Sequence, residues 1–308
     1  MHYLCKMNYN ELWRKLAQIH DEGEAKAIAR MVYEVRYGLS WTDLCIGKDT
    51  QLSANSQVEL EEISQRLLNH EPVQYVLGRA DFCGRTFVVN KNVLIPRSET
   101  EELCRWIIKE ESGERKVEGE KRKEESGCSI LDVGTGSGCI AITLAAEMPD
   151  AKVSAWDISA EALKVAEENA KRAHVHVSFA QVDVLHIPPS TFHSPLSTFH
   201  FPPSSFLSLI VSNPPYICHQ ERAAMEANVL EHEPHTALFV PDDDPLLFYR
   251  AIAQFAQTAL HPGGWLYFEV NPLYAAPLYD LLSTMSYHDI EIQEDQYGKQ
   301  RMMRARKG

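Results

Sequence analysis

The sequence predicts a two-part protein of the α/β class: a small helical bundle followed by a doubly wound, mostly parallel sheet. Apolar residues recur at helical spacing through residues 8–70. From Ile130 onward, short apolar runs alternate with helical segments, which is the pattern of βαβ units. We expect a helical domain at 1–74, a linker with a β-hairpin at 75–95, and the sheet domain at 96–308.

Composition narrows the classes of function. Thirty basic residues against 43 acidic residues give a net charge of −13, which disfavours a broad phosphate-binding surface. The seven cysteines are scattered and contain no Cys-x-x-Cys pair, so they indicate reduced thiols without a zinc site. No uncharged run approaches the ~20 residues of a membrane span. We expect a cytoplasmic protein that binds no metal, no membrane and no nucleic acid directly.

Four helices are expected in the first part. Asn8 and Glu11 form a capping-box pattern, and a second helix ends near Gly38. Ser40 begins a short third helix, and a fourth runs through residues 58–68. None of these segments carries residues typical of catalysis. The bundle therefore either braces the rest of the chain or binds a partner.

The connection between the two parts changes to a period of two. Residues 82–95 predict a β-hairpin that turns at Asn90-Lys91-Asn92. Ser98 can then cap a helix that runs to Lys109. The charged start of this helix is commonly a solvated first turn. Its position just before a glycine-rich motif suggests instead that Arg97 or Glu99 closes over a ligand.

A glycine-rich turn follows the first strand of the sheet domain. Its spacing is G-x-G-x-G, whereas dinucleotide sites use G-x-G-x-x-G. The next two strands end at Asp157 and Asp183, which are either helix caps or ligands of a nucleoside. The combination is typical of S-adenosylmethionine sites. The predicted cofactor-binding residues are Gly134, Thr135, Gly136, Ser137, Gly138, Asp157, Asp183 and Val184, together with Arg97, Glu99 and Asn213.

A second motif, Asn213-Pro214-Pro215-Tyr216, follows the buried strand Leu209–Ser212. The prolines cannot continue a ladder, so Asn213 lies at the carboxyl end of the strand, where open α/β sheets bind ligands. The Asn213 side-chain oxygen and the Pro214 carbonyl are two acceptors suited to a planar NH2 group, and Tyr216 offers a flat face. The simpler interpretation is a strand that ends in a Pro-Pro turn.

The remaining segments carry less chemistry. Residues 109–127 and 186–206 read as surface insertions. Glu233-Pro234 is interpreted as a rigid turn beside the ligand crevice, because no Cys or HExxH pattern supports a metal. A helix at 245–260, a Pro262-Gly263-Gly264 turn, a strand at 265–270, a helix at 272–285 and an antiparallel edge hairpin formed by 290–293 and 301–306 complete the chain.

Taken together, the glycine turn and the Asn-Pro-Pro-Tyr motif resemble the class I methyltransferases that modify amide or exocyclic amino nitrogens. Further motifs extend from Asn8 to Arg306 and resemble the release-factor glutamine methyltransferases, the PrmC/HemK family. They are Glu71-Pro72-Val73-Gln74-Tyr75-Val76-Leu77-Gly78, Ile95-Pro96-Arg97, Glu99-Thr100-Glu101, Glu233-Pro234 and Ala237-Leu238. Ser98, Val270-Asn271 and the two insertions depart from the family pattern.

The resemblance implies a Rossmann-like fold and methyl transfer from S-adenosylmethionine to the glutamine amide nitrogen in the Gly-Gly-Gln loop of peptide-chain release factors. Asn213 and Pro214 would accept the amide hydrogens, and Tyr216, reached through Pro215, would confine the amide plane. Because that loop offers little surface, the helical domain would dock the release factor. An adenine-N6 methyltransferase is the alternative, but its flipped base needs a basic groove. A non-enzymatic nucleotide-binding module would leave the Asn-Pro-Pro-Tyr motif without a task.

Overall fold

The computed structural model describes residues 7–111, 128–187 and 206–308. Most of both expected insertions, residues 112–127 and 188–205, lies outside the described residues. The chain divides into two compact units, which are described separately. The helical unit comprises Met1–Arg79 with Met225–His232, and the sheet unit comprises Ala80–Ala224 with Glu233–Gly308.

The helical unit contains the four predicted helices together with shorter ones. The reciprocal capping box of Asn8 and Glu11 begins the first helix, a second capping box begins the third at Ser40, and Gly38 (φ 67°) ends the second. Leu12, Leu60 and other buried apolar residues form its core. The elements are α1 (Tyr9–Leu16), α2 (Glu22–Tyr37), α3 (Trp41–Cys45), a 3-10 turn (Lys48–Gln51), α4 (Ala54–Leu68) and α5 (Val73–Leu77).

A short helix from much later in the chain, α9 (Ala227–His232), belongs to the same helical unit. His232 Nε2 lies 3.0 Å from the backbone oxygen of Asn69, just after α4. The chain therefore leaves the sheet unit after residue 224 and returns to it at Glu233.

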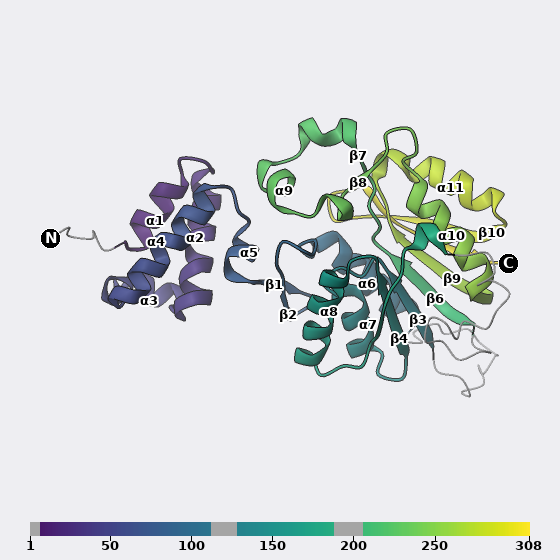
Figure 1. Cartoon of the computed structure of the whole chain (residues 1–308), viewed down its shortest axis with the longest axis horizontal. Coiled ribbons are helices and arrows are strands. Elements are labelled where there is room, and N and C mark those ends of the chain that lie inside the picture. Colours follow the sequence, from purple (N-terminus) through teal and green to yellow (C-terminus); the bar gives the residue numbers. More distant parts are fainter. Residues whose placement is uncertain (1–6, 112–127, 188–205) are drawn as a thin grey trace. The chain divides into compact units, whose positions relative to one another are not determined.

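The sheet unit is built on seven strands in the order β10-β11-β9-β6-β3-β4-β5 (Figure 1). The pairs from β9 to β5 are parallel, whereas β10 and β11 are antiparallel and form the predicted edge hairpin. The chain runs from β3 to β4 and β5 on one side and reaches β6 and β9 on the other. The strands are β3 (Ser129–Val133), β4 (Lys152–Asp157), β5 (Ser178–Gln181), β6 (Leu207–Ser212), β9 (Leu260–Glu269), β10 (Tyr287–Glu294) and β11 (Gln300–Lys307).

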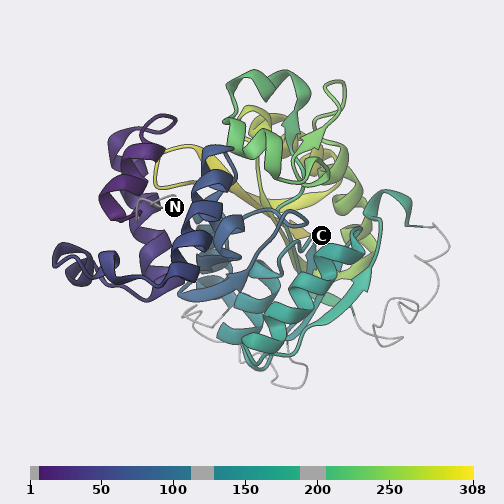
Figure 2. The ribbon, with the colours of Figure 1, turned by 60° about the vertical axis from the view of Figure 1, so that its left-hand side comes forward.

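Helices cover both faces of this sheet, which confirms the doubly wound α/β prediction (Figures 1 and 2). Neighbouring strand residues point to opposite faces: Ile130 packs in the cluster beneath α6, α7 and α8, and Leu131 packs in the cluster beneath α10 and α11. The helices are α6 (Ser98–Glu111), α7 (Cys139–Glu147), α8 (Ala160–Arg172), α10 (Leu247–Ala259) and α11 (Ala275–Thr284).

The position predicted for the connecting hairpin is wrong. Its strands are β1 (Arg79–Phe82) and β2 (Arg85–Val88), so the turn is Cys83-Gly84. Both turn residues have positive φ (47° and 72°), as the two-residue turns that match strand twist require. At the turn predicted around Asn90, its side chain instead accepts a hydrogen bond from the Asn92 amide, closing a local loop.

Two smaller expectations also change. Ser98 is the first residue of α6 and does not cap it: the Arg97 carbonyl accepts the Glu101 amide, and the Ser98 hydroxyl donates to Glu99. The expected Pro262-Gly263-Gly264 turn lies inside β9, where the register against β6 shifts between Leu207 and Leu209. Between these pairs β6 advances by two residues and β9 by five, and Gly263 has a φ of 81°, so the segment expected to turn forms an irregularity within the strand.

Candidate active site

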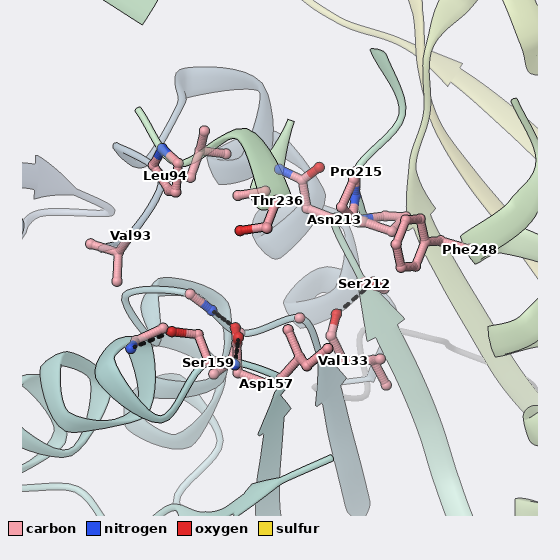
Figure 3. Close-up of a pocket in the computed structure, with 18 of the residues that line it drawn as sticks. Val93, Leu94, Val133, Asp157, Ser159, Ser212, Asn213, Pro215, Thr236 and Phe248 are labelled. Atoms are coloured by element: carbon pink, nitrogen blue, oxygen red, sulfur yellow. Dashed lines mark hydrogen bonds between the residues drawn. The ribbon is translucent and has the colours of Figure 1, made fainter. Parts of the chain in front are cut away.

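A cavity of about 350 Å³ opens at the carboxyl ends of β3, β4 and β6, where the strand order reverses (Figure 3). This edge is where doubly wound sheets bind ligands. Asp157 and Ser159 lie on one side of the cavity, and Asn213, Pro215 and Thr236 lie on the facing side. The predicted residues that line it are Arg97, Gly134, Thr135, Gly136, Ser137, Asp157, Asp183, Val184, Asn213, Pro214 and Pro215.

Three predicted site residues are absent from the described lining of the cavity: Glu99, Gly138 and Tyr216. Gly138 has a packing role, because a Cβ there would lie 2.8 Å from Ile142 Cδ1 and 3.1 Å from Ala166 Cβ. It therefore lets α7 approach α8 closely.

The glycine turn is held open by backbone hydrogen bonds. The amides of Gly134 and Thr135 donate to the Trp156 carbonyl at 2.8 and 2.9 Å. Gly134 and Gly136 have φ angles of 76° and 55°, which residues other than glycine rarely adopt. The turn thus presents bare backbone to the cavity and leaves room for a ligand to approach.

Asp157 closes this turn from the end of β4. Its two carboxylate oxygens accept the amides of Gly136 at 2.8 Å and Ser159 at 2.9 Å. Burial raises the pKa of the Asp157 carboxyl, and these backbone donors oppose that increase. The carboxylate faces the cavity with acceptor positions to spare, as ribose hydroxyls would require.

Asp183 combines the two roles that the sequence left open. Its side chain accepts the Leu185 amide at 2.9 Å and so caps the 3-10 helix Val184–His186. It also lines the cavity beside Val184. Capping and ligand contact are thus compatible at this position.

The Asn-Pro-Pro-Tyr loop is fixed to its neighbours at both ends. The Ser212 hydroxyl donates to the Val133 carbonyl at 2.6 Å, which ties β6 to β3. Asn213 Nδ2 donates to Thr100 Oγ1 at 3.3 Å, and Oδ1 makes no hydrogen bond within the described parts of the chain. The Tyr216 hydroxyl donates to Glu269 Oε1 at 3.0 Å, and burial raises the pKa of this phenol well above its usual value. Asn213 therefore presents a vacant acceptor while Tyr216 supports the loop from behind.

Three buried groups that the sequence did not assign to the site lie around it: Thr100, Glu233 and Glu269. Glu233 Oε1 pairs with Arg97 Nη2 at 2.5 Å, and Glu233 Oε2 accepts the Ile95 amide at 3.3 Å. Pro234 and Thr236 line the cavity next to this pair. The Glu-Pro turn thus fastens the segment before α6. Glu269 carried a readable signal, an acidic residue at the end of an apolar strand, like Asp157.

A further acidic group lies beneath the glycine turn. Asp132 is fully buried. Its Oδ2 accepts hydrogen bonds from the Thr135 hydroxyl at 2.6 Å and from the Ala141 amide at 3.3 Å. Oδ1 has no hydrogen-bond partner in the described chain. Burial raises the pKa of the Asp132 carboxyl to about 7, because these donors compensate for only part of its lost hydration.

The described residues form neither a metal cluster nor a membrane span. In that part of the chain no three His, Cys, Asp or Glu side chains gather as metal ligands would. None of its helices has the length and apolarity needed to cross a bilayer.

Comparisons with known proteins agree with this geometry. Residues 124–221 match a family model described as a methyltransferase domain, and residues 11–78 match one described as the PrmC N-terminal domain. The solved catalytic domain of hMettl16 shares the fold, with a TM-score of 0.50 at 15% identity over 77% of this chain and 79% of that one. The fold and the site define a methyltransferase of the S-adenosylmethionine-dependent class.

Full-length relatives give the family. The release factor glutamine methyltransferase of Bacteroides thetaiotaomicron is 42% identical over 95% of this chain and 96% of its own length. The protein of the same name from Flavobacterium psychrophilum is 38% identical over 98% and 99%. The chain belongs to the release factor glutamine methyltransferases, which confirms the resemblance seen in the motifs.

Proposed function

We propose that this protein transfers a methyl group from S-adenosylmethionine to the side-chain amide nitrogen of the glutamine in the Gly-Gly-Gln motif of peptide-chain release factors. The observation that carries the proposal is that Asn213, whose Oδ1 acceptor is unpartnered within the described residues, lines a cavity whose other side is formed by the glycine turn and Asp157. An acceptor for an NH2 group and a nucleoside site thus share one cavity. Membership of the family favours a protein glutamine over adenine N6 as the acceptor.

The residues present fit S-adenosylmethionine. The volume of the cavity is in the range of small-molecule sites. The backbone of Gly134 and Gly136 would lie against the methionine moiety, Asp157 would bind the ribose hydroxyls, and Asp183 and Val184 would border the adenine. When bound, this cofactor supplies an electrophilic methyl group on a sulfonium.

The chain's own task is to prepare a poor nucleophile. The lone pair of a carboxamide nitrogen is delocalised into its carbonyl, so the nitrogen must be held in line with the electrophile. Asn213 Oδ1 and the Pro214 carbonyl would each accept one amide hydrogen. As the new C–N bond forms, the bond from the methyl group to the sulfonium would break, and one of these hydrogens would become acidic and be lost to water as a proton. Preorganised acceptors stabilise the positive charge that develops on the nitrogen.

Arg97 and Glu233 would shape the entrance to this site. Their ion pair, together with the Ile95 amide, joins the segment before α6 to the Glu233-Pro234 turn. Arg97 lines the cavity, whereas Glu99, two residues later, does not. We assign Arg97 to the cofactor site on this basis and leave Glu99 out.

The helical unit is proposed to dock the release factor. Its described residues include no part of the cavity lining, and a Gly-Gly-Gln loop alone offers too small a surface for selection. We therefore keep the division into a helical docking domain and a methyltransferase domain that the sequence predicted. The boundary moves from residue 74 toward Arg79, because α5 packs in the core of the helical unit.

Transfer of labelled methyl groups tests the function. The protein is incubated with labelled S-adenosylmethionine and, in parallel, a release factor, the same factor with the motif glutamine changed to alanine, or DNA. We expect label only in the unaltered factor, recovered as N5-methylglutamine after proteolysis. Label in DNA, or equal label in the alanine variant, would refute the proposal.

A further inference from the structure

Glu269 is a buried carboxylate next to the Asn-Pro-Pro-Tyr loop, but it does not line the described cavity. Ser212 of β6 pairs with Phe268 of β9, so the residues that follow them, Asn213 and Glu269, lie side by side at this end of the sheet, where Glu269 is the last residue of β9 and still pairs with Met302 of β11. The exposure of Glu269 is only 1%. A charge in such a place is costly unless hydrogen bonds and neighbouring charges compensate for it.

Both oxygens of this carboxylate are engaged. Oε2 accepts Thr100 Oγ1 at 2.5 Å, and Oε1 accepts the Tyr216 hydroxyl at 3.0 Å. Burial raises the pKa of the Glu269 carboxyl and nearby Glu99 adds to the increase, whereas Thr100, Tyr216 and the charge of Arg301 oppose it. The two donors and the guanidinium favour the ionised form, which can only accept hydrogen bonds.

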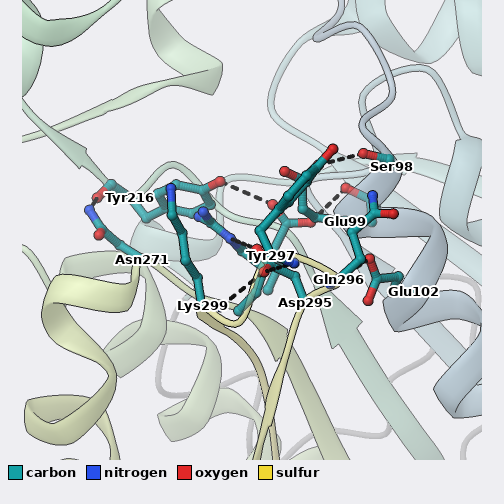
Figure 4. A network of polar contacts seen from close by, with 12 residues as sticks. Ser98, Glu99, Glu102, Tyr216, Asn271, Asp295, Gln296, Tyr297 and Lys299 are labelled. Atoms are coloured by element: carbon teal, nitrogen blue, oxygen red, sulfur yellow. Dashed lines mark hydrogen bonds and ion pairs between the residues drawn. The ribbon is translucent and has the colours of Figure 1, made fainter.

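Arg301 is itself held in place by the hairpin turn between β10 and β11. Its Nε lies 3.4 Å from Asp295 Oδ2. Asp295 Oδ1 accepts the amides of Tyr297 at 2.9 Å and Lys299 at 3.0 Å, which fixes the turn (Figure 4). The edge hairpin thus supplies a cation whose charge acts on Glu269 and Tyr216.

The single hydroxyl hydrogen of Thr100 determines which end of the Asn213 carboxamide faces Thr100. A threonine hydroxyl has one hydrogen, and Thr100 donates it to Glu269 Oε2. Toward Asn213, Thr100 can therefore only accept, so the NH2 end of the carboxamide must face it. The other end, Oδ1, is left for the cavity. If Glu269 instead donated a hydrogen bond to Thr100, the Thr100 hydroxyl could donate its own hydrogen to Asn213 Oδ1.

We propose that Glu269 is a positioning residue that acts through Thr100 to turn the Asn213 carboxamide so that its oxygen, and not its NH2 group, meets the substrate amide. The proposal rests on the proposed function for its effect on rate. It makes a separate claim about the orientation of Asn213, which can be measured without any substrate.

The kinetic test compares two Thr100 variants. Thr100→Val removes the hydroxyl at nearly constant volume, and we expect the single-turnover rate to fall by ~10–10²-fold, the scale for a misplaced reacting group. Thr100→Ser keeps the hydroxyl and should restore most of the rate. The matched control is Thr143→Val, which removes a buried hydroxyl in α7 that has no partner in the described chain, and it should leave the rate unchanged.

Epistasis separates positioning from a merely structural role. In an Asn213→Ala background there is no carboxamide to orient, so Thr100→Val should lower the rate by less than ~2-fold. A structural defect would instead multiply with the loss from Asn213→Ala. Glu269→Gln, checked for folding by thermal melting, should lose rate in the wild-type background and little in the Thr100→Val background. Independent, multiplicative losses would overturn the proposal.

The second measurement is independent of activity. Asparagine labelled with 15N gives side-chain NH2 signals, and the Asn213 pair is assigned by its absence in Asn213→Ala. We expect this pair to shift in Thr100→Val and Glu269→Gln but not in Thr143→Val. An unchanged pair would refute the positioning role even if release factors are methylated. If the pair shifts but no release factor is methylated, the proposed function fails and the orientation of Asn213 stands.

Discussion

Replacing Asn213 by aspartate gives a sharp test of the site, because the result should depend on pH. Asn213→Ala removes the acceptor, and methyl transfer should fall by ~10²–10³, or about 2.7–4 kcal/mol. Asn213→Asp keeps an oxygen toward the cavity but loses the NH2 group that donates to Thr100. Thr100 already donates its one hydrogen to Glu269. Two carboxylates would then compete for a single hydroxyl.

The distances in the structure give the repulsion energy between these two carboxylates. The Asn213–Thr100 and Thr100–Glu269 contacts are 3.3 and 2.5 Å, so the two carboxylates would be at most 5.8 Å apart. At an effective dielectric constant of about 20, two charges at that distance repel by about 3 kcal/mol. That repulsion raises the pKa of one member of the pair by about 2, to about 6 for an aspartate. Below that pH the pair holds one proton, which can replace the missing amide hydrogen.

The expected result is therefore an aspartate variant that recovers as the pH falls. The ratio of its single-turnover rate to that of the wild type, at saturating cofactor, should rise by ~10–10²-fold between pH 8 and pH 6, up to tenfold for each pH step of one. The corresponding ratio for Asn213→Ala should stay flat, which makes it the control. A flat ratio for aspartate, or one that rises with pH, would refute the hydrogen-bond directions assigned to Thr100. Near-normal transfer by Asn213→Ala would remove the loop from the mechanism.

Four further predictions follow from other parts of the structure. Asp157→Ala should weaken S-adenosylmethionine binding by roughly 1.5–3 kcal/mol, measured by calorimetry, and an unchanged affinity would exclude this carboxylate from the site. Gly138→Ala should lower the free energy of unfolding by about 1–3 kcal/mol in urea titrations, because φ is 81° and the new Cβ would meet α8. Asp132 holds its proton more tightly when folded, with a pKa of about 7 against 3.8, so wild-type stability should fall as pH rises through that interval. Asp132→Asn cannot ionise, so its unfolding free energy relative to wild type should increase by about 3 kcal/mol from pH 5 to pH 8, and a constant difference would contradict the raised pKa. A chain that begins at Ala80 should methylate a Gly-Gly-Gln peptide but lose most of its preference for the intact release factor over that peptide, whereas an unchanged preference would favour a bracing role for the helical unit.

Local signals in the sequence predicted much of the fold. Capping residues such as Asn8 and Ser40 act within three positions of the chain, so the sequence alone locates their helices. The same holds for the glycine turn, because its closely spaced glycines are the residues that readily adopt the positive φ angles observed there. The connecting hairpin was misplaced because the apolar runs near Val89 and Val93 dominated the pattern, whereas the Cys83-Gly84 turn decides the pairing.

The polar support of the site could not be predicted from local signals. Arg97 and Glu233 are 136 positions apart, and Thr100 and Glu269 are 169 apart, so neither pair leaves a local pattern. Helical geometry could have separated Arg97 from Glu99, however. Residues three apart lie on the same side of a helix and its start, and Arg97, just before α6, and Thr100, in its first turn, both line the cavity, whereas Glu99 is only two positions from Arg97.

The path of the chain through α9 has a topological consequence. The backbone crosses between the two units at three points, after residues 79, 224 and 232. The last crossing enters the sheet unit directly at Glu233, the partner of Arg97. The helical unit is therefore not an appendage that recombination at a single linker could exchange among enzymes. A replacement unit would have to accept an inserted α9 and return the chain to Glu233, so the two units are expected to be inherited together.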